Sequence, residues 1–131
     1  MLALRGPVYP PASLRVTSSP ITGSYSARHH DDDTAEEDYI YQSLGGTLGS
    51  GETVWRFNLK NGAFAPSDNN NFNFYLIANE SNLGGSTVDG YAVGVNLTDS
   101  DDDLKLVRVV NGAEGAEVVA SSFTWGSSTL V

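Results

Sequence analysis

Three segments in the middle of the chain place large apolar residues at every second position. They are TVWRFNL (Thr53–Leu59), FNFYLIA (Phe72–Ala78) and YAVGVNL (Tyr91–Leu97). Only extended backbone brings alternate side chains to one face, because successive side chains of a strand point to opposite sides. Runs rich in Asn, Gly and Asp separate the segments, as expected of turns. The pattern predicts antiparallel strands, each with one buried side.

A sheet of this kind buries its apolar face against a second layer, so the sequence predicts a single antiparallel β-sandwich over residues 1–131. No window keeps an apolar period of 3.6 residues, and no helix longer than a turn is expected. The large residues of the three segments are expected to meet in one interior. They are Trp55, Phe57, Phe72, Phe74, Tyr91, Val93 and Val95.

Shorter segments are candidates for the remaining strands. Residues 1–20 hold four of the five prolines and are predicted to form a Pro-rich arm, with at most a short strand at Leu14–Thr17. Asn111–Gly112 is a turn signal. The other candidates are Ser24–His29 paired with Tyr39–Leu44, Leu104–Val110 as the second arm of a hairpin, and closing strands at Glu117–Ser121 and Phe123–Trp125.

The charge balance excludes some classes of partner. The chain has 16 Asp and Glu against 7 Lys and Arg, a formal net charge of −9, and its basic residues form no run. Such a surface repels phosphate backbones, so we expect no nucleic-acid binding. There is no cysteine, which excludes a disulfide scaffold. No apolar run approaches the roughly 20 residues of a spanning helix, so we expect no membrane insertion.

An acidic run, DSDDD, follows the third segment and is a candidate metal site. Asp99, Asp101 and Asp103 have the spacing at which carboxylates in a tight loop converge on one calcium ion. The full EF-hand pattern fails, because Leu104 and Val110 stand where its Gly and Glu belong. A solvated hairpin tip whose charges discourage aggregation is the simpler interpretation. A calcium site is therefore the second interpretation of this acidic run, after the solvated hairpin tip.

No catalytic pattern is present, so the chain is not expected to be an enzyme. Glycoside hydrolysis uses two carboxylates across a cleft, but the Glu residues fall in or beside loops instead of alternating along one strand. His29 and His30 precede three aspartates, and imidazole beside carboxylate suits zinc or copper. Neighbouring residues of a strand face opposite sides, which favours a polar loop. A metal-dependent enzyme using His29 or His30 is the minor hypothesis.

Aromatic and amide side chains indicate a sugar-binding surface. Tyr39 and Tyr41 share one strand face, where they can stack on a pyranose ring or pack as a half-buried pair. Asn69 and Asn70 offer amide donors for sugar hydroxyls. Trp55 and Trp125 are expected in the core, because each sits in an apolar alternation.

Several phrases resemble modules of secreted surface proteins from Bacteroidetes-type bacteria. They are SSPITGSYSARH, TVWRFNLKNG, PSDNNNFNFYLIANE, DGYAVGVNL and DDLKLVRVVNG, and the resemblance spans roughly residues 18–125, most of the chain. The resemblance implies a concanavalin A-like or jelly-roll sandwich at the cell surface or outside the cell, and supplies no catalytic residues.

The expected function is therefore a non-catalytic extracellular binding module, with carbohydrate as its ligand. The alternative is a structural or adhesive subunit that associates with neighbouring surface-protein chains, or with copies of itself, through strand edges.

Overall fold

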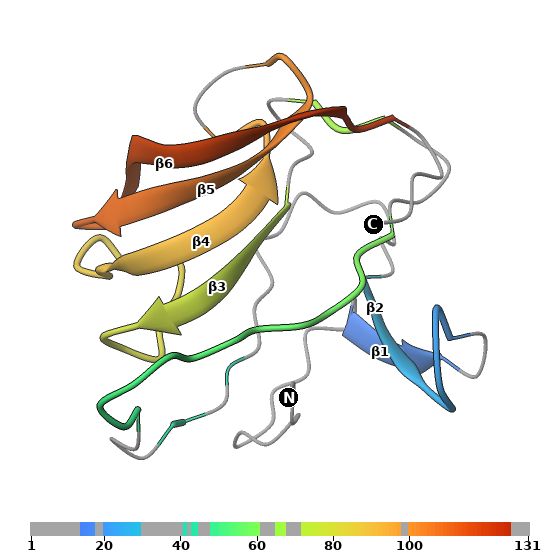
Figure 1. Ribbon diagram of the computed structural model, residues 1–131, viewed down its shortest axis with the longest axis horizontal. Helices are drawn as coiled ribbons and strands as arrows, with labels where there is room; N and C mark the ends of the chain where they lie inside the picture. The colour runs from blue at the N-terminus through green and yellow to red at the C-terminus, as the bar shows by residue number, and fades with distance from the viewer. Residues whose placement is uncertain are drawn as a thin grey trace. The chain divides into compact units, whose positions relative to one another are not determined.

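The computed structural model describes residues 14–17, 20–29, 41, 43–44, 48–60, 65–67, 72–97 and 100–126. These residues form strands, turns and irregular backbone, and none of them is in a helix. The chain divides into two compact units, Met1–Leu59 and Lys60–Val131, which are described separately (Figure 1). The all-β prediction is confirmed for this part of the chain.

The second unit contains a four-stranded antiparallel sheet. Its strands are β3 (Phe72–Ala78), β4 (Gly90–Val95), β5 (Asp103–Val110) and β6 (Ala113–Thr124), in the order β3-β4-β5-β6. Each strand therefore pairs with its neighbour in sequence, a meander of hairpins. The predicted strand at Phe72–Ala78 is confirmed, as is the hairpin of β4 and β5. The two predicted closing strands are one continuous strand, β6.

The first unit contains a small antiparallel ladder. Strands β1 (Leu14–Thr17) and β2 (Ser26–His29) pair with Leu14 opposite His29 and Thr17 opposite Ser26. The Ile21 backbone N–H donates to Ser26 Oγ at 2.9 Å, and Gly23 takes a φ of 73° in the turn between the strands. The short strand at Leu14–Thr17 is confirmed. The predicted pairing of Ser24–His29 with Tyr39–Leu44 stays a prediction, because β2 pairs with β1 along one edge and Tyr39, Ile40 and Gln42 lie outside the described residues.

Residues 52–59 form no strand, so the prediction at Thr53–Leu59 is wrong. Its alternation is as regular as that of Phe72–Ala78, but Figure 1 draws this segment as a tube and not as a strand arrow. Alternation allows a strand, but a strand also needs a partner that receives its backbone hydrogen bonds. The pattern alone could not supply that partner.

The best-packed core of the second unit lies on one face of the sheet. Its fully or nearly fully buried members are Val88, Ala92, Leu97, Val107 and Val109, with Tyr75, Ala78 and Leu83 packed against them. Register explains the grouping, because Ala92 lies between Tyr75 of β3 and Val107 of β5. Val88 and Leu83 come from the connector 79–89, so this loop contributes apolar side chains to the same cluster as the sheet.

The predicted inward face of β4 is partly wrong. Tyr91 is 43% exposed, whereas Ala92, on the opposite face, is fully buried. Val95 and Leu97 are buried as expected, but they do not share one face. Asn96 between them has a φ of 57°, and this left-handed residue breaks the two-residue period. Leu97 consequently joins Ala92 in the cluster described above.

The opposite face of the sheet includes Phe72, which packs on Trp125. Phe72 meets the fully buried Trp125 edge to face, with ring centroids 5.4 Å apart. Phe72 is also paired in register with the buried Val95. Phe57 is 38% exposed and Tyr91 is exposed, so the predicted common interior is wrong for these two residues.

The β5–β6 hairpin closes through the predicted Asn111–Gly112 turn. Val110 pairs with Ala113, and Asn111 and Gly112 have φ values of 50° and 73°. Positive φ at both central residues is the type I′ geometry that favours Asn-Gly. The turn is tied to the connector 79–89, because Gly112 N donates to Val88 O and Asn111 N donates to Asp89 Oδ1.

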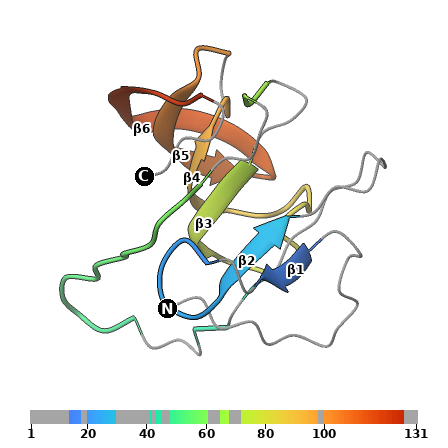
Figure 2. The same ribbon diagram turned by 90° about the vertical axis from the view of Figure 1, so that its right-hand side faces the viewer.

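Strand β6 is long, irregular and at the edge of the described sheet. Its pairing with β5 shifts register at three places, where β6 carries extra residues. Bulges of this kind increase the local twist of a strand. Figure 2 shows the resulting curvature of β5 and β6. Val118, Val119 and Phe123 are exposed along this strand.

Candidate functional site

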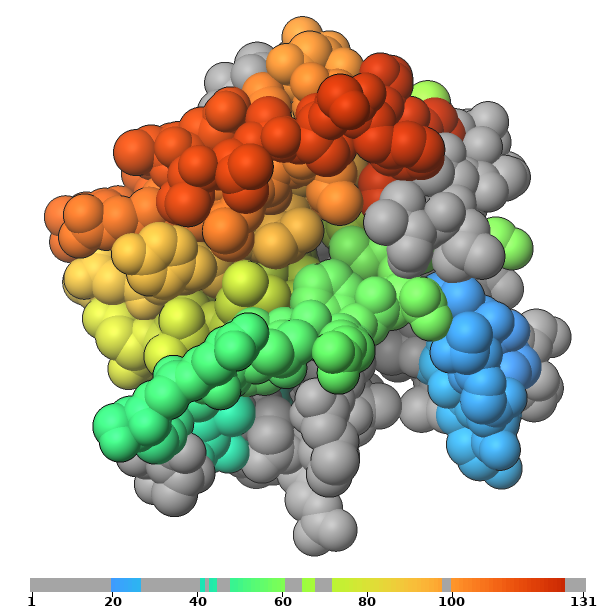
Figure 3. Space-filling model, in the orientation of Figure 1, coloured from blue at the N-terminus to red at the C-terminus, as the bar shows by residue number. Residues whose placement is uncertain are grey.

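An open hollow in the first unit combines aromatic and polar side chains. Its volume is about 510 Å³, and it is wide open to solvent. The lining residues are Thr22, Trp55, Arg56, Phe57 and Asn58. They come from the turn after β1 and from the irregular segment 48–59, and Figure 3 shows both regions at the surface.

One hydrogen bond joins the two regions that line the hollow. The Asn58 side-chain amide donates to Thr22 Oγ1 at 3.3 Å. Thr22 itself lies in the turn that the Ile21–Ser26 hydrogen bond closes. Since both ends of this bond are exposed, it orders the rim of the hollow without isolating it from water.

The two aromatic rings of the hollow are accessible to a ligand. Trp55 is half-buried and Phe57 is exposed by more than a third of its surface. Arg56 and Asn58 are exposed as well. An aromatic face attracts the C–H face of a sugar ring, while guanidinium and amide groups donate hydrogen bonds to its hydroxyls. The hollow therefore provides both kinds of contact that a saccharide needs.

The structure places few of the sugar-binding residues predicted from the sequence. Tyr39, Asn69 and Asn70 lie outside the described residues. Tyr41 is half-buried and is not in a strand, so no strand at this position sets which way its ring faces. The predicted Tyr39–Tyr41 pair stays a prediction.

Sequence reasoning missed the aromatic residues of the hollow because it assigned Trp55 to the core. The sequence did contain a signal for an exposed aromatic surface, namely the polar residues that alternate with the two aromatic ones. Arg56 and Asn58 alternate with Trp55 and Phe57, so polar hydrogen-bonding groups accompany both rings. The corresponding positions in Phe72–Ala78 include Tyr75 and Ile77, which are apolar or aromatic.

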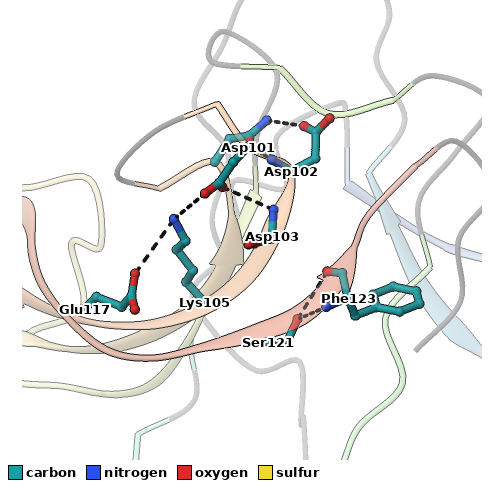
Figure 4. A network of polar contacts seen from close by, with 8 residues as sticks. Asp101, Asp102, Asp103, Lys105, Glu117, Ser121 and Phe123 are labelled. Atoms are coloured by element: carbon teal, nitrogen blue, oxygen red, sulfur yellow. Dashed lines mark hydrogen bonds and ion pairs between the residues drawn. The ribbon is translucent and has the colours of Figure 1, made fainter.

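The acidic segment after β4 forms a network around a buried lysine (Figure 4). Lys105 is 3% exposed, and its ammonium lies 3.1 Å from Asp101 Oδ2 and 3.8 Å from Glu117 Oε2. Both carboxylates are about half exposed. A lysine is rarely buried without a charged partner, and Asp101 and Glu117 provide that partner here.

A second pair of side chains fixes the ends of the loop between β4 and β5. Asn96 Nδ2 donates to Asp102 Oδ1 at 2.8 Å, and Asp102 N donates to Asn96 Oδ1 at 2.9 Å. Both residues have positive φ, which Asn and Asp tolerate better than most. The backbone N–H of Trp125 donates to the backbone carbonyl of Asp102, so the loop is also joined to the chain just after β6.

The described aspartates of the proposed calcium site have other contacts. Asp101 pairs with Lys105 and accepts a hydrogen bond from Asp103 N at 3.4 Å, while Asp99 lies outside the described residues. Within the described ranges, no group of three or more His, Asp or Glu side chains is placed to hold a metal ion. The calcium site stays a prediction that requires Asp99 or other undescribed residues.

The histidine hypothesis falls at the limit of the described chain. His29 ends β2, and His30 with the following acidic residues lies outside the described residues. The described segments also contain no helix that is long and apolar enough to cross a membrane.

Comparison of the chain with protein-family models, with curated proteins and with solved structures found no match.

Proposed function

We propose that this chain is a non-catalytic extracellular module that binds carbohydrate in the Trp55–Phe57 hollow. The observation that carries the proposal is the hollow of about 510 Å³, which brings two accessible aromatic rings together with an arginine, an asparagine and a threonine. A sugar ring offers apolar C–H faces and many hydroxyls, so its recognition requires both aromatic and hydrogen-bonding groups. The extracellular location rests on the resemblance to secreted surface modules.

The fold that accompanies this function is a two-layer sandwich of the concanavalin A-like or jelly-roll type. What supports it is the apolar character of both faces of the β3–β6 sheet. Ala92 and Val107 are buried on one face, and Phe72 and Val95 lie on the other. Val88 and Leu83 of the connector 79–89 already pack on the Ala92 face, so a second sheet is called for on the Phe72 face alone, as in a two-layer sandwich.

The proposal is tested by binding to a glycan array and to insoluble polysaccharides. The double variant Trp55→Ala, Phe57→Ala removes both rings and is expected to abolish retention by any glycan that the native chain binds. Tyr25→Ala is the matched control, because Tyr25 is 70% exposed in the same unit but does not line the hollow. Equal binding by the native chain and the double variant would refute this site.

Tyr41→Ala separates the hollow from the surface predicted at Tyr39 and Tyr41. If the hollow is the site, this change leaves glycan retention intact. Loss of binding in Tyr41→Ala with retention in the double variant would move the site to the tyrosine pair. A native chain that binds no glycan at all would contradict the function itself.

A second candidate function is assembly of copies of the chain along β6. The favourable observation is that β6 is a 12-residue edge strand of the described sheet on which Val118, Val119 and Phe123 are exposed. Exposed apolar edges promote pairing with other chains. The three register shifts and the exposed Glu114 and Glu117 oppose it, since bulges and charges protect edges. Carbohydrate binding is therefore the leading function.

Assembly is tested by sedimentation of the native chain over a range of concentrations. If copies associate through β6, Val119→Lys shifts the distribution to monomer. Val54→Lys is the control, because Val54 is exposed to a similar extent, 55% against 57% for Val119, and lies outside any strand. A native chain that sediments as a monomer at all concentrations would exclude this function.

A further inference from the structure

The hollow contains a positive charge in a protein that is strongly acidic overall. Arg56 is one of only 7 basic residues, against 16 acidic ones. It is exposed and lines the hollow, and in the sequence it stands between Trp55 and Phe57. A cation at this position is therefore a local exception to the net charge of −9.

Arg56 also differs from the buried cation of the second unit. Lys105 lies against the carboxylates of Asp101 and Glu117. Within the described part of the chain, the ion pairs involve Lys105, and Arg56 makes none. Its guanidinium is therefore not neutralised by a described carboxylate and is accessible to a negative group on a ligand.

From this charge we propose that the hollow selects a saccharide bearing an anionic group, with a uronic acid as the best fit. The inference rests on the proposed carbohydrate function. The planar guanidinium forms paired hydrogen bonds with a carboxylate, and such charge-assisted bonds are stronger than those between neutral groups. The adjacent rings would stack on the pyranose, while Asn58 and Thr22 lie at the rim for its hydroxyls.

The net charge of the protein restricts which anionic sugars fit. A polymer with closely spaced sulfates would meet the field of an acidic protein along its whole length. A short oligosaccharide with one charge per ring places its carboxylate near Arg56 and keeps its other charges few. At physiological salt, screening acts over about 8 Å, so the local contact persists better than the long-range repulsion. The preference is therefore for short uronate oligomers over densely charged polymers.

The experiment is a calorimetric titration of the full chain with an oligogalacturonate, with its methyl ester and with a sulfated neutral oligosaccharide of equal length. The native chain is expected to bind the acid about 10-fold more tightly than the ester, because a hydrogen bond to a charged group contributes about 1.5 kcal/mol or more. Equal affinity for acid and ester would overturn the inference and leave the carbohydrate function standing. Binding of neither would overturn the inference, while the carbohydrate function itself is decided by the glycan array.

Variants of Arg56 show whether this side chain causes the preference. Arg56→Gln is expected to weaken binding of the acid by about 10-fold while the ester loses about twofold, since the guanidinium also contacts hydroxyls. Arg56→Lys keeps the positive charge but lacks the planar guanidinium. Its affinity for the acid is expected to lie between that of the native chain and that of Arg56→Gln. Arg108→Gln is the matched control, an exposed arginine on β5. If Arg56→Gln keeps the native preference for the acid, the inference fails.

The sulfated oligosaccharide distinguishes the two sources of negative charge. Tighter binding of the carboxylate than of the sulfate supports a uronate site. Equal binding of both, each above the ester, supports a site for anionic sugars in general. Thermal unfolding of each variant accompanies the titrations, and a native-like transition is expected because Arg56 is exposed.

Discussion

The two units of this chain contain similar alternating sequences with different outcomes. In the second unit, Phe72–Ala78 pairs with β4, and residues on both faces of the sheet are buried. In the first unit, residues 53–59 alternate as regularly but form no strand, and Phe57 is exposed. The comparison teaches that the same periodicity leads to a packed core where a neighbouring strand exists and to an accessible aromatic surface where none does.

The largest expected effect compares the two tryptophans. Trp125→Ala is expected to lower the free energy of unfolding by about 3–5 kcal/mol, because Trp125 is fully buried against Phe72. Trp55→Ala is expected to cost about 1 kcal/mol or less, because its ring lines an open hollow. Urea unfolding measures both changes. Equal losses would show that Trp55 belongs to a core after all.

Trp125→Phe sharpens this test. The Trp125 indole N–H is buried and has no hydrogen-bond partner in the described part of the chain. Phenylalanine keeps most of the ring and removes that donor, so the loss of packing is offset by relief of desolvation. We expect the free energy of unfolding to change by no more than about 1 kcal/mol. A loss as large as that of Trp125→Ala would show that the N–H has an acceptor.

The second comparison uses two glycines with the same φ of 73°, Gly23 and Gly112. A Cβ at Gly112 would collide with Gly85 O and lie 2.8 Å from Ser86 Cα, whereas one at Gly23 meets no atom within 4 Å. Gly23→Ala is expected to cost about 1–2 kcal/mol from backbone strain alone. Gly112→Ala adds the collision and is expected to cost about 2–4 kcal/mol.

Thermal and urea unfolding measure both glycine variants. Gly49→Ala is the control, since its φ is not positive and nothing lies within 4 Å of its Cβ. It is expected to change the free energy of unfolding by no more than about 0.5 kcal/mol. If Gly112→Ala is as mild as Gly23→Ala, the contact between the Asn111–Gly112 turn and the connector 79–89 is not tight.

The buried lysine gives a smaller expected effect. Lys105→Met keeps much of the side-chain volume but leaves Asp101 and Glu117 without their cation. We expect a loss of about 1–2 kcal/mol, less than for a fully buried pair, because both carboxylates are half exposed. Glu117→Gln is expected to cost about 0.5 kcal/mol or less at its 3.8 Å distance. Urea unfolding of Lys105→Met at low and high salt measures the loss, and a variant as stable as the native chain would contradict it.

The smallest expected effect concerns calcium. Because Asp101 is already paired with Lys105, the described residues give no reason for a change in melting temperature on adding calcium or a chelator. Differential scanning calorimetry tests this directly. A rise with calcium that Asp101→Asn removes would support the Asp99–Asp101–Asp103 site, since an ion bound by the native state alone stabilises it.

Local sequence predicted much of the second unit. Phe72–Ala78 was predicted with its observed bounds, and the Asn111–Gly112 turn followed from the need for positive φ at both residues. The face of β4 could not be predicted, because Val88 and Leu83 reach the Ala92 side from a connector whose path the two-residue period does not encode. The hollow was missed for the same kind of reason, since the five lining residues come from two separate regions.

The sequence by itself determined that the described part of the chain is all-β, that the protein is acidic and where several strands and turns lie. These properties depend on neighbours in the chain, such as the alternation in β3 and the Asn-Gly pair before β6. The tertiary structure decided which alternating segment acquires a pairing partner, which face of β4 is buried and that Asp101 meets Lys105. Burial and charge pairing depend on residues distant in sequence, and periodicity carries no record of which distant residues will meet.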